Sequence, residues 1–196
     1  MLMGFVLVIA PWSYRNTVVQ NEFTLIDTMG GMNLMMGNYE HTPLNRAWDA
    51  VALITTTQGW AYEFNQKPDA RSATEQQRAN WASQQAKEFM LDNPYLTMQR
   101  SVIKFFSFWG LERVIIAGWQ QGLYNPGKWV IAVGSGFILV AYVSLMLLAA
   151  QGFFLALPED KRFHYFVWLL VLVVTGIHTL VFGHSRYHLP LIPFFA

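Results

Sequence analysis

The chain has no cysteine and little charge. Its 196 residues contain no Cys, which excludes disulfide bonds and thiolate catalysis. Only 13% of the residues are charged, the net charge is +1, and the basic residues are dispersed along the chain. No polybasic run suggests a groove for nucleic acid or a patch for anionic lipid. We therefore expect no nucleic-acid partner.

Apolar residues dominate the composition. They make up 54% of the chain, and the mean hydropathy is positive at +0.26, which is unusual for a soluble domain of this length. Residues 129–157 and 163–182 form two apolar runs. Each is long enough to cross a bilayer, which takes about 20 residues. The composition therefore predicts a membrane protein with two complete transmembrane helices.

The loop between these runs, residues 158–162, predicts the orientation. It contains Lys161 and Arg162. Because short loops with an excess of Lys and Arg stay in the cytoplasm, we expect this loop to be cytoplasmic. Residues 12–128 and 183–188 then lie on the outer face. The expected location is a bacterial inner (plasma) membrane, with the long loop outside.

Both ends of the chain resemble interrupted spans. Residues 1–11 are apolar but make only about half a span, and we interpret them as the end of a transmembrane helix. Residues 189–196 begin another apolar run, and we interpret them as the start of one. The predicted fold class is an all-α polytopic membrane protein fragment. It has two complete spans, two partial ones and a long extracytoplasmic loop that contains helices.

Two helices are expected within the long loop. Ser72 and Glu75 have capping-box spacing and predict a helix to about Leu91. A second helix, at about residues 95–110, segregates its side chains into two stripes. The apolar stripe is Met98, Val102, Phe105 and Trp109, and the other is Arg100, Lys104 and Ser107. This pattern is typical of a helix in the headgroup plane, with ordinary core packing as the alternative.

Residues 28–38 are rich in glycine and asparagine. Such a segment suits turns with positive φ, and its amides suit a polar ligand. The candidates for a substrate-binding loop are Gly30, Gly31, Asn33 and Asn38. The alternative interpretation is a folded turn without a ligand.

Residues 183–188 gather polar side chains between two apolar runs. They include His184, Arg186, Tyr187 and His188. Arginine and imidazole are costly at a hydrocarbon boundary and are usually kept where something anionic or polar lies beside them. A phosphate near the membrane surface fits this description.

Several short motifs follow one another in an order that resembles a known family. They are Pro11-Trp12-Ser13-Tyr14-Arg15-Asn16, Gly30-Gly31-Met32-Asn33-Leu34, Gly37-Asn38, Ala86, Phe89, Asn93-Pro94, Lys104 and Arg186-Tyr187-His188-Leu189-Pro190-Leu191. Together they resemble the C-terminal half of polyprenyl-phosphate-sugar-dependent membrane glycosyltransferases of the protein mannosyltransferase and aminoarabinose transferase type. The resemblance spans nearly the whole chain.

The resemblance implies an enzyme of the C-type glycosyltransferase fold. Such enzymes transfer a sugar from a polyprenyl-phosphate carrier to a glycan, lipid or protein acceptor on the outer face. The family's catalytic acid lies in an earlier outer loop, so we expect it upstream of this chain and expect the chain to be inactive alone. Asp27, Glu40 and Asp49 are not assigned that role.

Arg186 is the first candidate for the carrier phosphate. Breaking a sugar–phosphate bond places negative charge on the leaving phosphate, and a preorganised cation there is worth on the order of 3 kcal/mol. The guanidinium fork matches phosphate oxygens and never deprotonates. Tyr187 and His188 are expected as hydrogen-bond donors, with His184 in the same lipid-phosphate-binding segment. Arg15 is the second candidate cation, and a snorkelling interface anchor is its alternative role.

Metal and cofactor binding are not expected. His184 and His188 have the i,i+4 spacing of a zinc pair, but no acidic residue lies between them and no third ligand is apparent. His178, inside the second span, suggests helix–helix hydrogen bonding. A secondary transporter is disfavoured because residues 130–157 carry no charge. A non-catalytic membrane scaffold or lipid-carrier-binding subunit remains the alternative function.

Overall fold

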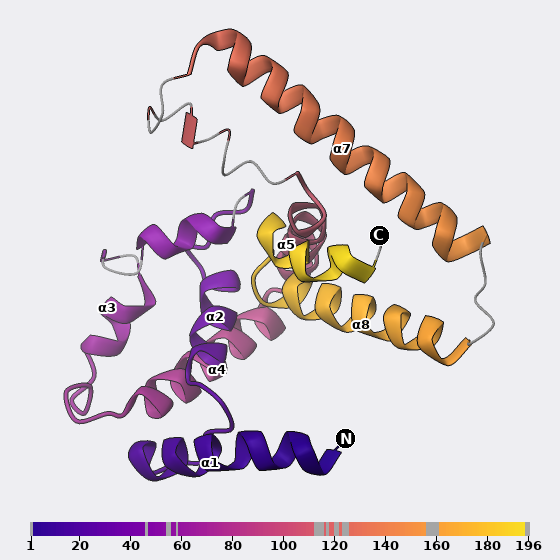
Figure 1. Cartoon of the computed structure of the whole chain (residues 1–196). Coiled ribbons are helices and arrows are strands. Elements are labelled where there is room, and N and C mark those ends of the chain that lie inside the picture. The colour runs from indigo at the N-terminus through magenta and orange to yellow at the C-terminus, as the bar shows by residue number, and fades with distance from the viewer. Residues whose placement is uncertain are drawn as a thin grey trace. The chain divides into compact units, whose positions relative to one another are not determined.

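The computed structural model describes residues 2–45, 47–53, 56–57, 59–111, 116, 118–119, 122, 126–155 and 161–194, and the regular elements within them are all helices (Figure 1). In chain order the elements are α1 (Leu2–Gln20), α2 (Met29–Gly37), η1 (Ala47–Leu53), α3 (Trp60–Asn65), α4 (Glu75–Asp92), α5 (Pro94–Phe108), α7 (Lys128–Leu155), α8 (Lys161–Leu180) and η2 (Ser185–Phe194). The all-α prediction is confirmed for this part of the chain. The chain forms two compact units, which we describe separately.

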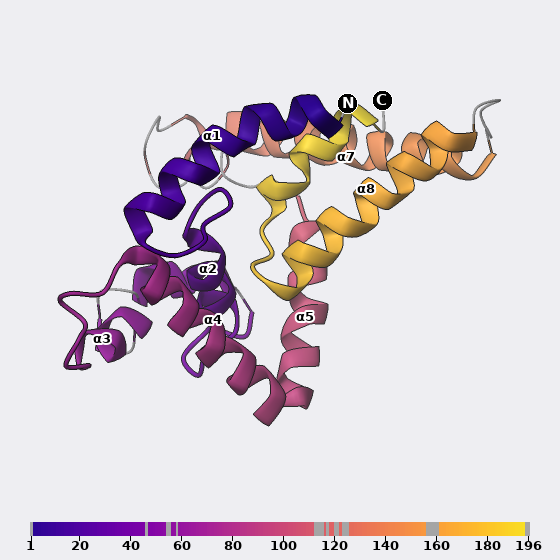
Figure 2. The ribbon, with the colours of Figure 1, turned by 90° about the horizontal axis from the view of Figure 1, so that it is seen from below.

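Unit 1 comprises Met1–Lys104 and Thr179–Gly183, and its core lies where α2 packs on α4. These two helices lie side by side in both ribbon views (Figures 1 and 2). Met35 of α2 and the residues Ala82 and Ala86 of α4 are fully buried there. The small alanines let the helix backbones approach each other closely.

The glycine-rich segment is a helix, so the prediction of positive-φ turns at residues 28–38 was wrong. Among the described residues only Asn21 and Gly122 have positive φ, and neither lies in α2. Burial outweighs the weak helix propensity of glycine, because Met35 and Met36 turn inward from α2. Gly31 and Gly37 therefore serve packing rather than turn geometry, because a Cβ on either would lie within 2.0 Å of a backbone oxygen.

The N-terminal cap of α4 is Thr74 rather than the predicted Ser72. The Thr74 hydroxyl accepts from the Gln77 backbone N–H at 3.2 Å, and the Gln77 side chain accepts from the Thr74 N–H at 3.0 Å. The hydroxyl of Ser72 instead donates to the carbonyl of Asp69. The capping box therefore starts two residues later than predicted, while the helix ends at Asp92, one residue past the predicted Leu91.

Helix α1 continues past the predicted boundary at residue 11 and ends at Gln20. Three of its side chains donate hydrogen bonds to the segment that follows the helix. Trp12 Nε1 donates to the Ile26 carbonyl at 3.1 Å, Asn16 Nδ2 donates to the same oxygen at 2.6 Å, and the Ser13 hydroxyl donates to the Leu25 carbonyl. The polar residues of the first motif thus attach α1 to the segment before α2.

Helix α5 buries its cations and exposes its apolar stripe. Arg100 and Lys104 are 4% and 2% exposed, whereas Met98 and Val102 are 68% and 51% exposed. The predicted segregation of side chains is present, but the polar stripe faces the protein. An apolar surface turned outward in this way suits hydrocarbon better than water.

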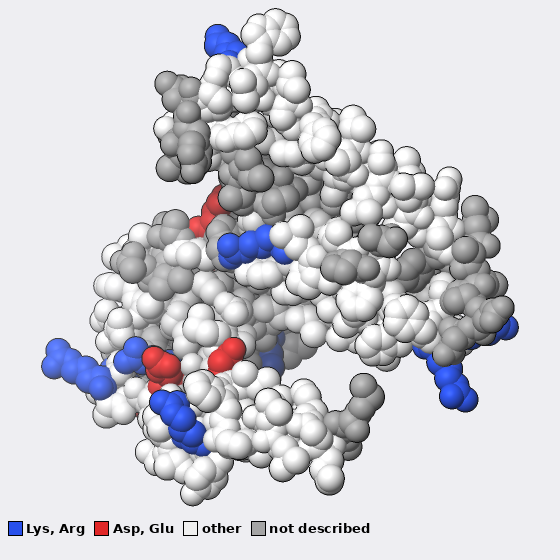
Figure 3. Space-filling view, viewed as in Figure 1, with Lys and Arg blue, Asp and Glu red and all other residues white. Residues whose placement is uncertain are grey.

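Unit 2 comprises Phe105–His178 and His184–Ala196. Within the described residues, Lys128–Gly152 of α7 and Lys161–Leu180 of α8 are long and apolar enough to cross a membrane. None of the apolar window in α7 and only 6% of that in α8 is buried, in contrast to a core helix of a soluble protein, which is mostly buried. On the face in Figure 3 the surface over α7 is uncharged, except for a blue residue where the helix begins. These features weakly indicate membrane association.

Two predicted boundaries of unit 2 shift in the structure. Helix α8 begins at Lys161, so both cations of the predicted loop 158–162 lie in its first turn, and residues 158–160 lie outside the described residues. Residues 185–194 form the 3₁₀ helix η2 rather than a short motif followed by an α-helix. Pro190 and Pro193 lack the N–H that an α-helix would use.

Candidate functional site

A column of planar side chains supports Arg186 in unit 2. The Tyr187 ring stacks on the His178 ring with centroids 4.5 Å apart and planes 7° from parallel. The His178 ring in turn stacks on Phe108 at 5.5 Å and 16°. Arg186 is exposed, and its Cζ lies 5.2 Å from the centre of the Tyr187 ring. The guanidinium is thus presented at the outer end of a stack that begins on α5 and α8.

The first turn of η2 fixes the backbone beside this guanidinium. The Arg186 backbone N–H donates to Nδ1 of His184 at 3.2 Å, and Arg186 Nη2 lies 3.5 Å from the Tyr187 hydroxyl. Because His184 Nδ1 accepts, the proton of a neutral His184 imidazole resides on Nε2, which is a donor. Three predicted residues, His184, Arg186 and Tyr187, are therefore brought together.

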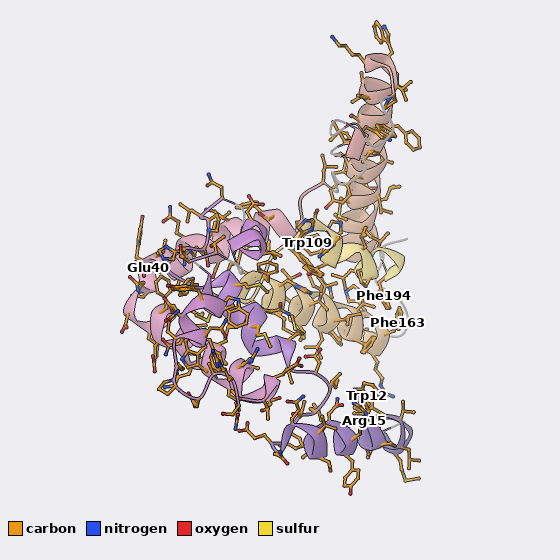
Figure 4. All side chains as sticks on the ribbon, turned by 90° about the vertical axis from the view of Figure 1, so that its left-hand side faces the viewer. Trp12, Arg15, Glu40, Trp109, Phe163 and Phe194 are labelled. Carbon is orange, nitrogen blue, oxygen red and sulfur yellow. The ribbon has the colours of Figure 1, made fainter. Side chains whose placement is uncertain are left out.

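His188 has a different environment, although it was predicted in the same set. It is 1% exposed, and its Nδ1 lies 2.6 Å from the Phe108 carbonyl, which makes this nitrogen the donor. Trp109, labelled in Figure 4, stacks on His188 at 5.9 Å and 20°. The Tyr142 hydroxyl donates to the Trp109 carbonyl at 2.7 Å. His188 and Tyr142 thus satisfy carbonyls at the end of α5, and phosphate binding by His188 stays a prediction.

The described charged residues of unit 2 are basic. They are Lys128, Lys161, Arg162 and Arg186. Positive charge on the described part of this unit attracts an anionic ligand more than a cationic one.

Asn38, predicted to bind substrate, lies instead in a buried polar cluster of unit 1. It is 1% exposed; its Nδ2 donates to the carbonyls of Leu34 and Leu180 at 3.0 and 2.8 Å, and its Oδ1 accepts from Lys104 Nζ at 2.9 Å. Lys104 Nζ also donates to the Leu180 carbonyl at 3.1 Å. Burial, and then the nearby Arg100, lower the pKa of Lys104 to about 7. The cluster ties α2 and α5 to the last residue of α8.

Arg100 extends this cluster along α5. Its Nη1 and Nη2 donate to the carbonyls of Tyr39 and Thr42, each at 2.8 Å, and burial lowers its pKa. Sequence reasoning placed Arg100 and Lys104 on the polar stripe of a helix in the headgroup plane and missed their acceptors. No local signal marks them, because the carbonyls that they bind lie about 60 or more residues away in the sequence.

The remaining predicted loop residues lie on α2. A Cβ on Gly31 would lie 2.0 Å from the Ala79 carbonyl oxygen, so glycine is required there for packing on α4. A Cβ on Gly30 would meet nothing within 4 Å, and Asn33 is half-buried. The structure brings neither Gly30 nor Asn33 into a described polar cluster, and their substrate role stays a prediction.

Arg15 is exposed on α1, beside Trp12 (Figure 4). Its Nη1 donates to Asn16 Oδ1 at 3.0 Å, and its Cζ lies 5.3 Å from the centre of the Trp12 ring. A guanidinium beside tryptophan suits both the anchor and the phosphate role. Arg15 belongs to unit 1, so its part in a site with Arg186 stays a prediction.

Comparisons with known proteins assign no family to the chain. The arrangement at the start of η2 offers a fixed guanidinium and an imidazole N–H next to an apolar helix. Such donors recognise phosphate or carboxylate oxygens. No family model matches the chain, and neither a curated protein nor a solved structure matches it.

Proposed function

We propose that this chain is part of an integral membrane glycosyltransferase. It transfers a sugar from a polyprenyl-phosphate carrier to a glycan, lipid or protein acceptor on the outer membrane face, and Arg186 binds the carrier phosphate. The observation that carries the proposal is the exposed guanidinium stacked on Tyr187, six residues after the end of α8. The order of motifs along the chain supports the choice of family.

The geometry suits a lipid-linked phosphate for two reasons. A guanidinium can form two parallel hydrogen bonds to phosphate oxygens, and the stack on Tyr187 reduces the side-chain freedom that binding would otherwise remove. The apolar surface of α8 lies along the chain directly before this site and suits a polyprenyl tail. Unit 2 therefore contains a cation suited to the phosphate and an apolar helix surface suited to the polyprenyl tail.

During transfer the same guanidinium stabilises the departing carrier. An acceptor oxygen bonds to the anomeric carbon of the sugar as the sugar–phosphate bond breaks, and the electron pair of the broken bond stays on the phosphate oxygen. The added negative charge strengthens the ion pair with Arg186. His184 Nε2 supplies a second donor to the phosphate. The acceptor's proton passes to the family's catalytic acidic residue in its carboxylate form, and no acidic residue of this chain is assigned that role. No metal or cofactor takes part in the proposal.

The test is phosphate-dependent lipid binding by the whole chain in nanodiscs of zwitterionic lipid. The quantity measured is the ratio of the dissociation constant for polyprenol to that for polyprenyl phosphate. We expect Arg186→Ala to lower this ratio about 10- to 150-fold, as loss of about 1.5 to 3 kcal/mol from a hydrogen-bonded charged group implies. Arg186→Lys should retain part of the ratio, because it keeps the charge but loses the fork.

Arg162→Ala is the matched control, since it removes the same side chain from the first turn of α8. It should leave the ratio unchanged. A wild-type ratio in Arg186→Ala would overturn the phosphate role. Sugar transfer measured in membranes that contain the protein separates the scaffold alternative. In a scaffold, Arg186→Ala would lower carrier binding without lowering sugar transfer.

A further inference from the structure

His178 is the residue on which the Arg186–Tyr187 pair rests. It lies in the last turns of α8, and its ring is nearly parallel to Tyr187 on η2 and to Phe108 on α5, at 7° and 16°. The sequence suggested only a helix–helix hydrogen bond for it. In the structure it is the ring that joins the exposed end of the column to its buried end.

Phe108 gives the column a fixed base. Its side chain is 0% exposed, and its carbonyl accepts from His188, which is itself buried. A buried aromatic ring in a packed environment has little rotational freedom. His178 stacked on such a ring, and attached to a helix, is therefore held in one orientation.

We propose that His178 is a positioning residue of the phosphate site: its imidazole holds the Tyr187 ring, and Tyr187 holds the guanidinium of Arg186 toward the carrier phosphate. This inference rests on the proposed function. His178 does not contact the phosphate. It acts by removing alternative rotamers of Tyr187 and Arg186 that would turn the guanidinium away.

The proposal depends on the flat face of the imidazole rather than on its volume. A stacked aromatic pair contributes about 0.5 to 1.5 kcal/mol beyond burial, which corresponds to about a 2- to 12-fold effect on binding. Leucine has a similar size but no planar face, whereas phenylalanine keeps the face and has no ring nitrogen. His178→Leu and His178→Phe therefore separate stacking from packing.

The experiment measures the same polyprenol to polyprenyl phosphate ratio, with the whole chain in nanodiscs. We expect His178→Leu to lower the ratio about 2- to 12-fold and His178→Phe to keep it near the wild-type value. Affinity for neutral polyprenol should not change in either variant. A purely structural role of His178 would weaken binding of both lipids equally and leave the ratio unaltered.

His164→Leu is the matched control, because it removes the other histidine of α8, whose Nε2 accepts from Trp168 near the start of the helix. It should not change the ratio. In an Arg186→Ala background His178→Leu should have no further effect on the ratio, since the group that it positions is gone.

Each outcome bears on one of the two proposals. If Arg186→Ala lowers the ratio but His178→Leu does not, the positioning role is wrong and the phosphate role stands. An additive loss in the double variant, or equal losses in His178→Leu and His178→Phe, also overturns the positioning role. If Arg186→Ala leaves the ratio unchanged, the proposed function fails, and the inference fails with it.

Discussion

At the residue scale, two buried cations of unit 1, Arg100 and Lys104, have carbonyl and amide oxygens as their acceptors among the described residues. These oxygens carry partial rather than full charges. Such contacts offset desolvation only in part, and Arg100 Nε is buried without an acceptor in the described part of the chain. The lowered pKa of Lys104 is the direct consequence of this imbalance.

We predict that the stability of unit 1 rises with pH between about 7 and 10 because of Lys104. Its pKa is about 7 in the folded chain, against an ordinary value of 10.5, so the unfolded chain binds more protons in this window. The free energy of unfolding then increases with pH by up to about 1.4 kcal/mol per pH unit. Below pH 7 both states are protonated and this dependence vanishes.

Lys104→Met provides the comparison for this prediction. It removes the titrating group, and Leu180 still accepts from Asn38. The measurement is the thermal unfolding midpoint in detergent from pH 7 to pH 9.5, for wild type and variant. We expect the midpoint of the wild type to rise relative to that of Lys104→Met, and parallel curves would contradict the assignment.

At the element scale, the packing of α2 on α4 depends on one glycine and not on its neighbour. A Cβ on Gly31 would lie 2.0 Å from a backbone oxygen of α4, which cannot swing aside as a flexible side chain could. Gly30 is exposed and has open space around its Cα. The two adjacent glycines form a matched pair within one helix.

We predict that Gly31→Ala destabilises the chain by about 1 to 3 kcal/mol or more, because α2 must move away from α4. Gly30→Ala should be neutral or stabilising by up to about 1 kcal/mol, since alanine favours the helix. Chemical unfolding in detergent micelles measures both. If Gly30 instead contacts a substrate, Gly30→Ala would lower carrier binding while stability stays unchanged.

Another result at the element scale is that α5 buries its polar face and exposes its apolar face. A helix with two segregated faces normally directs its polar face to water. In α5, Arg100 and Lys104 point inward because they donate hydrogen bonds to carbonyls of the 39–42 segment and of Leu180. Met98 and Val102 therefore face outward. The periodicity predicted two faces correctly, but the direction of each face depended on the acceptors.

At the scale of the whole molecule, the predicted orientation of the spans is testable directly. The chain has no Cys, so a single introduced cysteine is the only thiol of this chain that a reagent can modify. We predict that Lys87→Cys, exposed on α4, reacts with a membrane-impermeant maleimide added to intact cells. Lys161→Cys, in the first turn of α8, should react only after the membrane is permeabilised.

Labelling at position 161 but not at position 87 in intact cells would show that the orientation is reversed. Labelling at both positions in intact cells would show that α7, which lies between them, does not cross the membrane. Ser185→Cys is a further site on η2, and it should behave like Lys87→Cys if residues 183–188 lie outside.

Local patterns in the sequence determined the helical class and the two apolar helices α7 and α8. Each of these depends on hydrophobicity or periodicity over one helix, which can be read without knowing the partner. The end of α4 near Asn93-Pro94 was predictable for the same reason, because proline disfavours helix at the preceding residue.

Only the tertiary structure decided the polar interactions. Asn38 was predicted to bind a ligand, yet its partners Lys104 and Leu180 lie 66 and 142 residues away along the chain. The stack of His178 on Tyr187 likewise joins two elements. A hydrogen bond or a ring contact forms only where the two groups lie close together in the folded chain. Local sequence patterns do not specify which distant residues become neighbours. The polar residues could therefore be identified from the sequence, but their partners could not.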